Sequence, residues 1–278
     1  MDELSQIDLA FCVDLTNSMT PFLEAARAHM LSILAGLTES TRADLRVALV
    51  GYKDYGKRIK PVTVHAFAAN PAATRSVLSR LCVGSPAENT DAAEAVFAGL
   101  SACLDSLEWR PAAAKALLLI GDAPPHGCGA DSGPYADRFP KGDPSGQTLM
   151  GMGSAVESAG VTLHALGMLP SVIPVHDAVT ARCFGWLAET TGGTYRPARS
   201  SRDAMAVVEV IGRRVFGEMD FDRRVWERLA GDGADALPAT GRLDELMPEL
   251  QEALGAAPYE IHAAVARLRR RMPPRKRG

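Results

Sequence analysis

Several features that define other protein classes are missing from this sequence of 278 residues. It has no uninterrupted run of about 18 apolar residues, so we expect no transmembrane helix. Its start, Met1-Asp2-Glu3-Leu4, lacks the basic and apolar regions of a secretory signal. Charged residues make up 23% of the chain, near the globular average, which argues against global disorder.

Cysteine is scarce and unpatterned. The five cysteines include no Cys-x-x-Cys pair, and Cys12, Cys82 and Cys103 stand in apolar contexts. This favours buried free thiols in a reducing cytoplasm over a disulfide framework, so the expected location is cytoplasmic.

Zinc-finger spacing is also missing. His126 and Cys128 could be combined with His164, His176 or Cys183, but no pair among them has the spacing of a zinc finger. We therefore expect His126 to be an ordinary polar loop residue and His164 to pack in the core or on a strand face.

The net charge of −3 hides an asymmetry. Residues 263–278 carry seven Lys or Arg and no acid, which leaves −10 for the other 262 residues. An acidic body makes nucleic acid an unlikely partner. The basic tail is either a solvated end or a docking segment for an acidic protein or nucleic acid.

The pattern of apolar runs predicts a mostly parallel sheet with helices on both faces. The chain is 47% hydrophobic and long enough for one large α/β domain with a small appendage. Strands are expected at 7–13, 45–52, 62–68, 116–120, 161–167 and 194–196, and helices at 21–37, 70–81, 91–107, 177–190 and 202–217.

Only about nine residues separate the second and third expected strands, too few for a parallel crossover. This pair should therefore be an antiparallel hairpin. The fold class is α/β, a doubly wound, mostly parallel six-stranded sheet with one antiparallel edge strand. Strand signals stop after residue 218, which predicts a domain at 1–218 and a helical C-terminal appendage at 219–278, with helices at 221–230, 241–254 and 259–271.

Three loops at strand ends or helix starts carry oxygen ligands. They contribute Asp14, Thr16 and Ser18 after the first strand, Thr90 before a helix, and Asp122 after the central strand. Loops at the carboxyl ends of parallel strands converge on one crevice, so two carboxylates and three hydroxyls would meet there. Each loop taken alone reads as an ordinary helix cap or turn; the three together point to a metal site.

The chemistry of this set favours a hard cation. All donors are oxygens with modest charge, which suits Mg²⁺ or Mn²⁺ and does not suit zinc. In an extended turn, residues 14, 16 and 18 can face one ion. Hydroxyl ligands leave the ion incompletely neutralised, so an open position would attract a carboxylate from another molecule.

These motifs resemble those of von Willebrand factor A (vWA) domains with a metal-ion-dependent adhesion site (MIDAS). That family has an Asp-x-Ser-x-Ser loop, a Thr before a helix and an Asp after the central strand, and here Thr16 replaces the first Ser. The resemblance covers roughly residues 5–218. It implies that Asp14, Thr16, Ser18, Thr90 and Asp122 hold the ion.

Three segments are similar to the α-kinase-associated branch of vWA domains. They are Val50-Gly51-Tyr52-Lys53-Asp54, the run from Asp122 to Gly127, and the run from Phe139 to Pro144. The chain departs from that branch because it has no kinase domain, so the resemblance does not imply phosphoryl transfer. Asp54 either supports the metal from outside its ligand set or simply begins the turn of the hairpin.

The expected function is a non-enzymatic adaptor or scaffold that recruits an acidic residue of a partner protein to the metal. The resemblance suggests an intracellular, bacterial-type signalling or defence assembly, an analogy rather than a derivation. The long loop from Ala123 to Gln147, beside the metal, is the candidate for partner specificity.

The alternative is a Mg²⁺-dependent hydrolase or phosphoesterase that uses a metal-bound water. It is disfavoured because only His126 could serve as a general base. A Ser18–His126–Asp122 triad is also conceivable, but the nucleophile elbow Gly-x-Ser-x-Gly is missing. Residues 51–57 fit Gly-x-x-x-x-Gly-Lys, yet Arg58 and a following strand exclude a P-loop.

Overall fold

The structure is a computed structural model and describes residues 3–26, 43–56, 60–69, 91–133, 135–171, 174–230 and 237–272. The expected helix at 70–81, Thr90 and most of the expected helix at 21–37 lie outside these residues. Residues 20–26 are helical, as expected for the start of that helix. No helix in the described ranges is long and apolar enough to cross a membrane.

Six strands form one sheet in the order β3-β2-β1-β4-β5-β6. The strands are β1 (Gln6–Asp14), β2 (Asp44–Tyr52), β3 (Val62–Ala68), β4 (Ala114–Gly121), β5 (Thr162–Met168) and β6 (Tyr195–Ala198). Only β2 and β3 pair antiparallel; the other neighbours are parallel. The predicted fold class, including the antiparallel edge strand, is confirmed.

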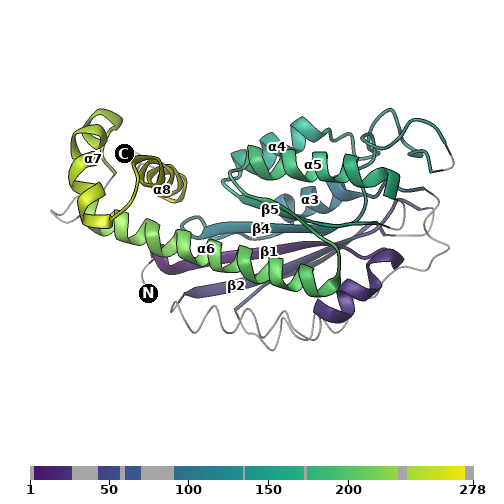
Figure 1. The fold of residues 1–278 in the computed structure, drawn as a ribbon, viewed down its shortest axis with the longest axis horizontal. Helices are drawn as coiled ribbons and strands as arrows, with labels where there is room; N and C mark the ends of the chain where they lie inside the picture. The colour runs from purple at the N-terminus through teal and green to yellow at the C-terminus, as the bar shows by residue number, and fades with distance from the viewer. Residues whose placement is uncertain are drawn as a thin grey trace.

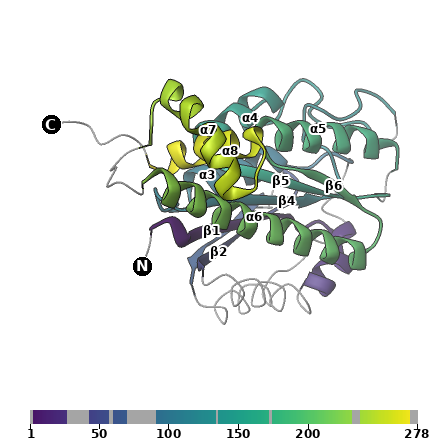
Figure 2. The same ribbon diagram turned by 60° about the vertical axis from the view of Figure 1, so that its left-hand side comes forward.

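Helices cover both faces of the sheet (Figures 1 and 2). On one face lie α3 (Val96–Asp105), α4 (Leu149–Ser158) and α5 (Asp177–Thr190); on the other lies α6 (Ser201–Leu229). The central strands β1 and β4 are buried on both faces, which explains why their sequences are apolar throughout rather than alternating.

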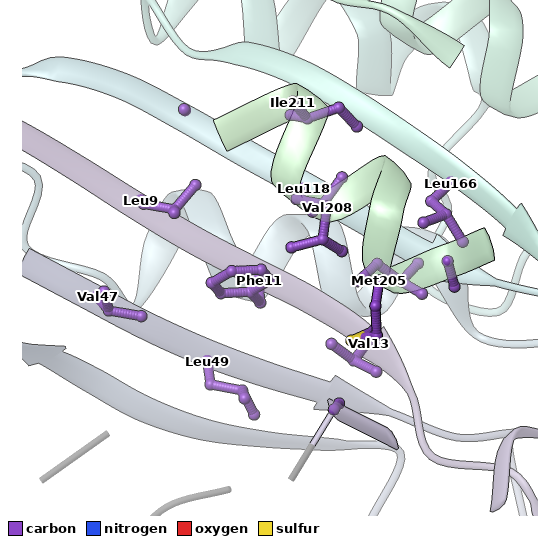
Figure 3. Packing of buried hydrophobic residues seen from close by; sticks show 14 of the residues in the cluster. Leu9, Phe11, Val13, Val47, Leu49, Leu118, Leu166, Met205, Val208 and Ile211 are labelled. Carbon is purple, nitrogen blue, oxygen red and sulfur yellow. The ribbon is translucent and has the colours of Figure 1, made fainter. Parts of the chain in front are cut away.

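Each face has its own hydrophobic core. Successive residues of β1 point alternately into the two cores. Leu9, Phe11 and Val13 pack toward α6, whereas Ala10 and Cys12 pack toward α3, α4 and α5. Figure 3 shows the first of these cores, in which Met205, Val208 and Ile211 of α6 lie over the strands. The two cores fix the sheet in place and thereby the positions of its loops.

The helix α6 is longer than expected. Its single span from Ser201 to Leu229 replaces the two predicted helices at 202–217 and 221–230. An apolar stripe continues through Val215, Met219 and Val225, so no break forms at the expected domain boundary, residue 218.

The last two helices, α7 (Thr240–Leu254) and α8 (Pro258–Arg271), pack with the end of α6 around a third, smaller core. They lie at the end of the sheet where the parallel strands begin (Figure 1). Arg271 attaches α8 to that end: its guanidinium donates to the carbonyls of Leu4 at 2.8 Å and Ala112 at 2.9 Å.

Part of the basic tail is therefore built into the fold. Arg267 donates three hydrogen bonds of 2.6–3.1 Å to Asp222 of α6, which is almost fully buried. The expectation of a solvated tail is wrong for Arg267 and Arg271, because α8 packs where both guanidinium groups reach buried acceptors. Residues 273–278 lie outside the described part of the chain.

The histidine of β5, His164, is buried as expected and faces α6. The backbone N–H of Thr194 donates to its Nδ1 at 3.2 Å. Burial lowers the pKa of His164 to about 4, so the folded protein holds a neutral imidazole at a pH where the unfolded chain is protonated.

We predict that His164→Asn reduces the loss of unfolding free energy that the wild type shows at acid pH. Because the folded-state pKa is depressed, the stabilisation is complete above about pH 6.5 and is lost as the pH falls toward 4. In urea unfolding at pH 7.5 and pH 4.5, the wild type should lose about 2–3 kcal/mol more than the variant. An equal loss in both proteins would contradict this assignment.

Candidate metal centre

The carboxyl ends of two adjacent strands bring two acidic residues together. Residue Val13 of β1 pairs with Ile120 of β4, so Asp14 ends one strand just where Gly121 and Asp122 end the other. The Asp14 side chain is fully buried, and that of Asp122 is 7% exposed. Parallel register, rather than any local motif, places these carboxylates at one edge of the sheet.

The turn after β1 folds around Asp14. The backbone N–H and the hydroxyl of Thr16 donate to Asp14 Oδ1 at 2.7 Å and 2.6 Å. The hydroxyls of Thr16 and Ser18 lie 3.2 Å apart, and Ser18 acts to lower the pKa of Asp122. Four of the five predicted ligands therefore gather in one cluster; the fifth, Thr90, lies outside the described residues.

One carboxylate oxygen of this cluster lacks a hydrogen-bond donor. Asp14 Oδ2 is buried and has no hydrogen-bond partner within the described chain. A buried carboxylate oxygen without a donor is costly unless a cation or a proton satisfies it. The orphaned oxygen thus fits a cation bound between Asp14 and Asp122.

Burial and nearby acids raise the pKa values of the carboxyl groups in this region. Burial, followed by the charge of Asp122, raises the pKa of Asp14 to about 8. Burial raises that of Asp122 to about 6, against the lowering effect of the Ser18 hydrogen bond. Glu94 is buried nearby, and burial together with the charge of Asp14 raises its pKa well above the ordinary value. A bound divalent cation would reverse these shifts.

The segment before α3 differs from the expected helix at 91–107. Helix α3 begins at Val96 rather than at residue 91. Instead, the Glu94 N–H donates to the Pro124 carbonyl at 3.0 Å, and its own carbonyl accepts from the His126 N–H at 3.2 Å. This bridge between two loops replaces the first helical turn and points the Glu94 carboxyl into the protein.

His126 is a buried ionic residue, so the expectation of simple loop polarity is wrong. Its Nε2 lies 2.6 Å from Asp54 Oδ1, and its Nδ1 lies 2.8 Å from Asp137 Oδ1. Burial alone would lower the pKa of His126, but the two carboxylates outweigh it and raise the pKa. Each ring nitrogen lies within hydrogen-bond distance of a carboxylate, so the protonated ring can donate from both nitrogens.

The contacts of the His126 ring bear on two chemical alternatives. Asp54, Asp91 and His126 offer atoms within 4.8 Å of one another, a group that could hold a metal. However, both ring nitrogens already face carboxylates, so a metal would have to displace one of them. The conceivable triad fails for the same reason, because His126 hydrogen-bonds to neither Ser18 nor Asp122.

The His126 cluster also anchors the long loop. Asp137 accepts from the N–H groups of Gly127 at 2.7 Å and Phe139 at 2.8 Å. Arg138 pairs with Asp54 at 3.1 Å, so Asp54 holds the loop and does more than begin the hairpin turn. Tyr55 adds a hydrogen bond of 2.8 Å to Asp143. The loop is thus fixed beside the two metal-site carboxylates.

Sequence reasoning missed Glu94 and Asp137 as members of this region. Both stand in segments without periodicity. Glu94 is bonded to Pro124 and His126, and Asp137 to His126, which are all more than 10 residues away along the chain. The only usable signal was the set of three segments similar to the α-kinase-associated branch. Two of them contain Asp54 and His126, and the third begins at Phe139, two residues after Asp137.

Gly121 makes room for this arrangement. A Cβ at this position would lie 2.3 Å from the hydroxyl oxygen of Tyr52 and 3.4 Å from Asp14 Cβ. The Tyr52 hydroxyl itself donates to the Ile120 carbonyl at 3.3 Å. Glycine is therefore needed where the buried tyrosine crosses the end of β4.

The fold is that of vWA and Rossmann-like domains, and comparisons with solved structures agree. The pilus adhesin SpaC from Lactobacillus rhamnosus GG matches with a TM-score of 0.55 and 17% identity, over 77% of this chain and 30% of that one. A von Willebrand factor type A protein from Catenulispora acidiphila matches with a TM-score of 0.50 and 15% identity, over 76% and 43%.

A third structure is proximal thread matrix protein 1 from the mussel byssus, in a form whose MIDAS motif is occupied by zinc. It matches with a TM-score of 0.50 and 13% identity, over 76% of this chain and 46% of that one. At these identities the likeness shows the fold alone.

Comparison by sequence gives one curated relative. The α-protein kinase vwkA of Dictyostelium discoideum is 29% identical over 144 residues. The match covers 51% of this chain but only 22% of the kinase, so the chain spans about a fifth of that protein. No family model matches the chain.

We predict that Gly121→Ala destabilises the protein by about 1–3 kcal/mol, because the new methyl group meets the Tyr52 hydroxyl. Tyr52→Phe removes that oxygen and should recover much of the loss in the double variant. Urea unfolding of the two single variants and the double variant measures the coupling. Strictly additive effects would show that the close contact is not the cause.

Proposed function

We propose that the chain is a divalent-cation-dependent protein-binding module. Its ion, Mg²⁺ or Mn²⁺, would be held by Asp14, Thr16, Ser18, Thr90 and Asp122, directly or through water, and would recruit an acidic residue of a partner protein. The observation that carries the proposal is the buried, partnerless Asp14 Oδ2 beside Asp122.

The identity of the ion follows from the donors. The cluster offers carboxylate and hydroxyl oxygens and no sulfur or imidazole nitrogen, because His126 is committed to Asp54 and Asp137. Such a set favours Mg²⁺ or Mn²⁺. A zinc-loaded MIDAS in the mussel protein supports the general idea of a metal at this place in the fold.

A binding role is favoured over hydrolysis by the state of His126. A metal-dependent hydrolase needs a base near the attacking water, and His126 was the candidate. A ring that donates from both nitrogens has no lone pair with which to accept a proton. We therefore propose that the chain is not an enzyme.

An adaptor or scaffold role in an intracellular, bacterial-type signalling or defence assembly is the more specific proposal. The kinase relative supports it, because its matching segment is a part of a much longer protein. In the pilus adhesin SpaC, likewise, the matching fold covers only 30% of the chain. Modules that recur inside larger proteins commonly supply contacts rather than chemistry.

We predict that Asp14→Ala or Asp122→Ala abolishes Mg²⁺ and Mn²⁺ binding while the sheet still folds. Each substitution removes a carboxylate from the proposed ligand set. Calorimetric titration with each metal measures binding, and circular dichroism checks folding. Asp131→Ala, an exposed acid in the long loop, is the matched control and should bind like the wild type. Equal binding by wild type and both site variants would refute the site.

We further predict that partner capture depends on the ion. The protein is incubated with an extract of its source cell in Mg²⁺. A partner protein should stay bound in Mg²⁺ and be released by EDTA, and the Asp14→Ala variant should capture none. Replacing the partner's contacting Asp or Glu by Asn or Gln should abolish binding. Metal-independent capture would contradict the proposal. Mg²⁺-dependent turnover of phosphoesters that Asp14→Ala loses would favour the enzyme instead.

A further inference from the structure

A small pocket, here called the side pocket, lies directly beside the metal cluster. Its lining includes Ser18 and Asp122 of that cluster, and its volume is about 200 Å³. Pockets that take whole small-molecule ligands usually measure roughly 300–1,000 Å³. The side pocket is therefore suited to one side chain of a bound protein segment rather than to a whole cofactor.

The apolar walls of the side pocket come from segments that are distant in sequence. Met19 and Phe22 follow β1. Met168 ends β5, Leu169 comes next, and Ala198 ends β6. Met19, Phe22 and Ala198 are buried, but Met168 and Leu169 are partly exposed. Part of the apolar wall is thus left for a bound side chain to cover, and covering it favours binding.

Helix α6 begins at the rim of the side pocket. Ser200 and Ser201 line the pocket, and Figure 1 shows the start of α6 beside the helical segment that follows β1. An α-helix carries a partial positive charge at its N-terminus, and α6 is 29 residues long. Asp203, the acid of the first turn, partly offsets this charge, but it is not among the residues that line the pocket.

Arg199 adds a full positive charge at the same rim. Its side chain is exposed and forms no ion pair with any residue in the described part of the chain. Among the described lining residues, the other charged one is Asp122, whose charge the ion would neutralise. A cation without an internal partner, next to an apolar wall, is complementary to a ligand that carries an anionic group beside an apolar side chain.

We propose that the partner segment carries two acidic residues and one large apolar residue. The first acid binds the ion, the apolar side chain fills the side pocket, and the second acid pairs with Arg199 at the start of α6. The side pocket shares Asp122 with the metal cluster, so one continuous segment can make all three contacts. This inference rests on the proposed function, because it extends the segment whose first acid the ion recruits.

The test selects short random peptides with one fixed Asp on the immobilised full chain in Mg²⁺ and elutes them with EDTA. We expect the eluted peptides to share a second acid and a large apolar residue at constant positions. In a synthetic copy, replacing the second acid by its amide should weaken binding about three- to tenfold. Replacing the apolar residue by Ser should weaken it at least about tenfold. Eluted peptides that lack either residue would overturn the proposal.

Two charge reversals on the protein test the contact with Arg199. Arg199→Glu should bind the selected peptide about tenfold more weakly, and replacing the second acid by its amide should then cause no further loss. Arg202→Glu is the matched control, because Arg202 is exposed in the same first turn of α6 and is not among the lining residues. Equal losses in the two variants would contradict the role of Arg199.

Calorimetric titration with Mg²⁺ separates this inference from the proposed function. Arg199 is hydrogen-bonded to no member of the described metal cluster, so Arg199→Glu should still bind the ion. Loss of the ion in that variant would contradict the assignment of Arg199 to the partner. A wild type that binds Mg²⁺ but yields no peptide in EDTA would overturn this inference and leave the metal site standing. A wild type that binds no Mg²⁺ would refute the proposed function and this inference with it.

Discussion

The rest of this structure depends on the burial of two acidic side chains at the ends of β1 and β4. Parallel register places Asp14 beside Asp122, and the two hydrophobic cores prevent the strands from separating. Solvent cannot stabilise these carboxylates, so the nearby hydroxyls of Thr16 and Ser18 stabilise them instead. One oxygen stays unsatisfied within the described chain, and this deficit is the physical basis of a cation site.

In the neighbouring His126 cluster, buried acids are compensated by basic side chains of the protein itself. There the acids Asp54 and Asp137 face a cationic ring, and Arg138 adds a second positive charge. Because its charges are paired internally, this cluster can serve as an anchor for the loop. The contrast explains why two adjacent groups of buried acids have different roles: one is compensated by the chain itself, and the other requires an ion.

The candidate metal site and the C-terminal helices lie at opposite ends of the sheet. The carboxylates lie where the parallel strands end, whereas α7 and α8 lie where they begin (Figure 1). Arg271 and the Asp222–Arg267 pair fasten α8 to the sheet and to α6. A partner bound at the ion would therefore leave the C-terminal helices accessible for a separate contact.

The sequence by itself determined the order of the strands along the chain, the antiparallel edge and the cluster of Asp14, Thr16, Ser18 and Asp122. The order of the strands and the antiparallel edge follow from runs of apolar residues and from loop lengths, which are local signals. The cluster follows from the rule that the carboxyl ends of parallel strands meet at one edge of a sheet. The continuity of α6, the late start of α3 and the roles of Glu94, His126 and Asp137 were decided only by the tertiary structure. Each of these depends on contacts between segments distant in sequence: a buried charge is stabilised by whichever partner the fold places next to it, and no pattern within one segment records that partner.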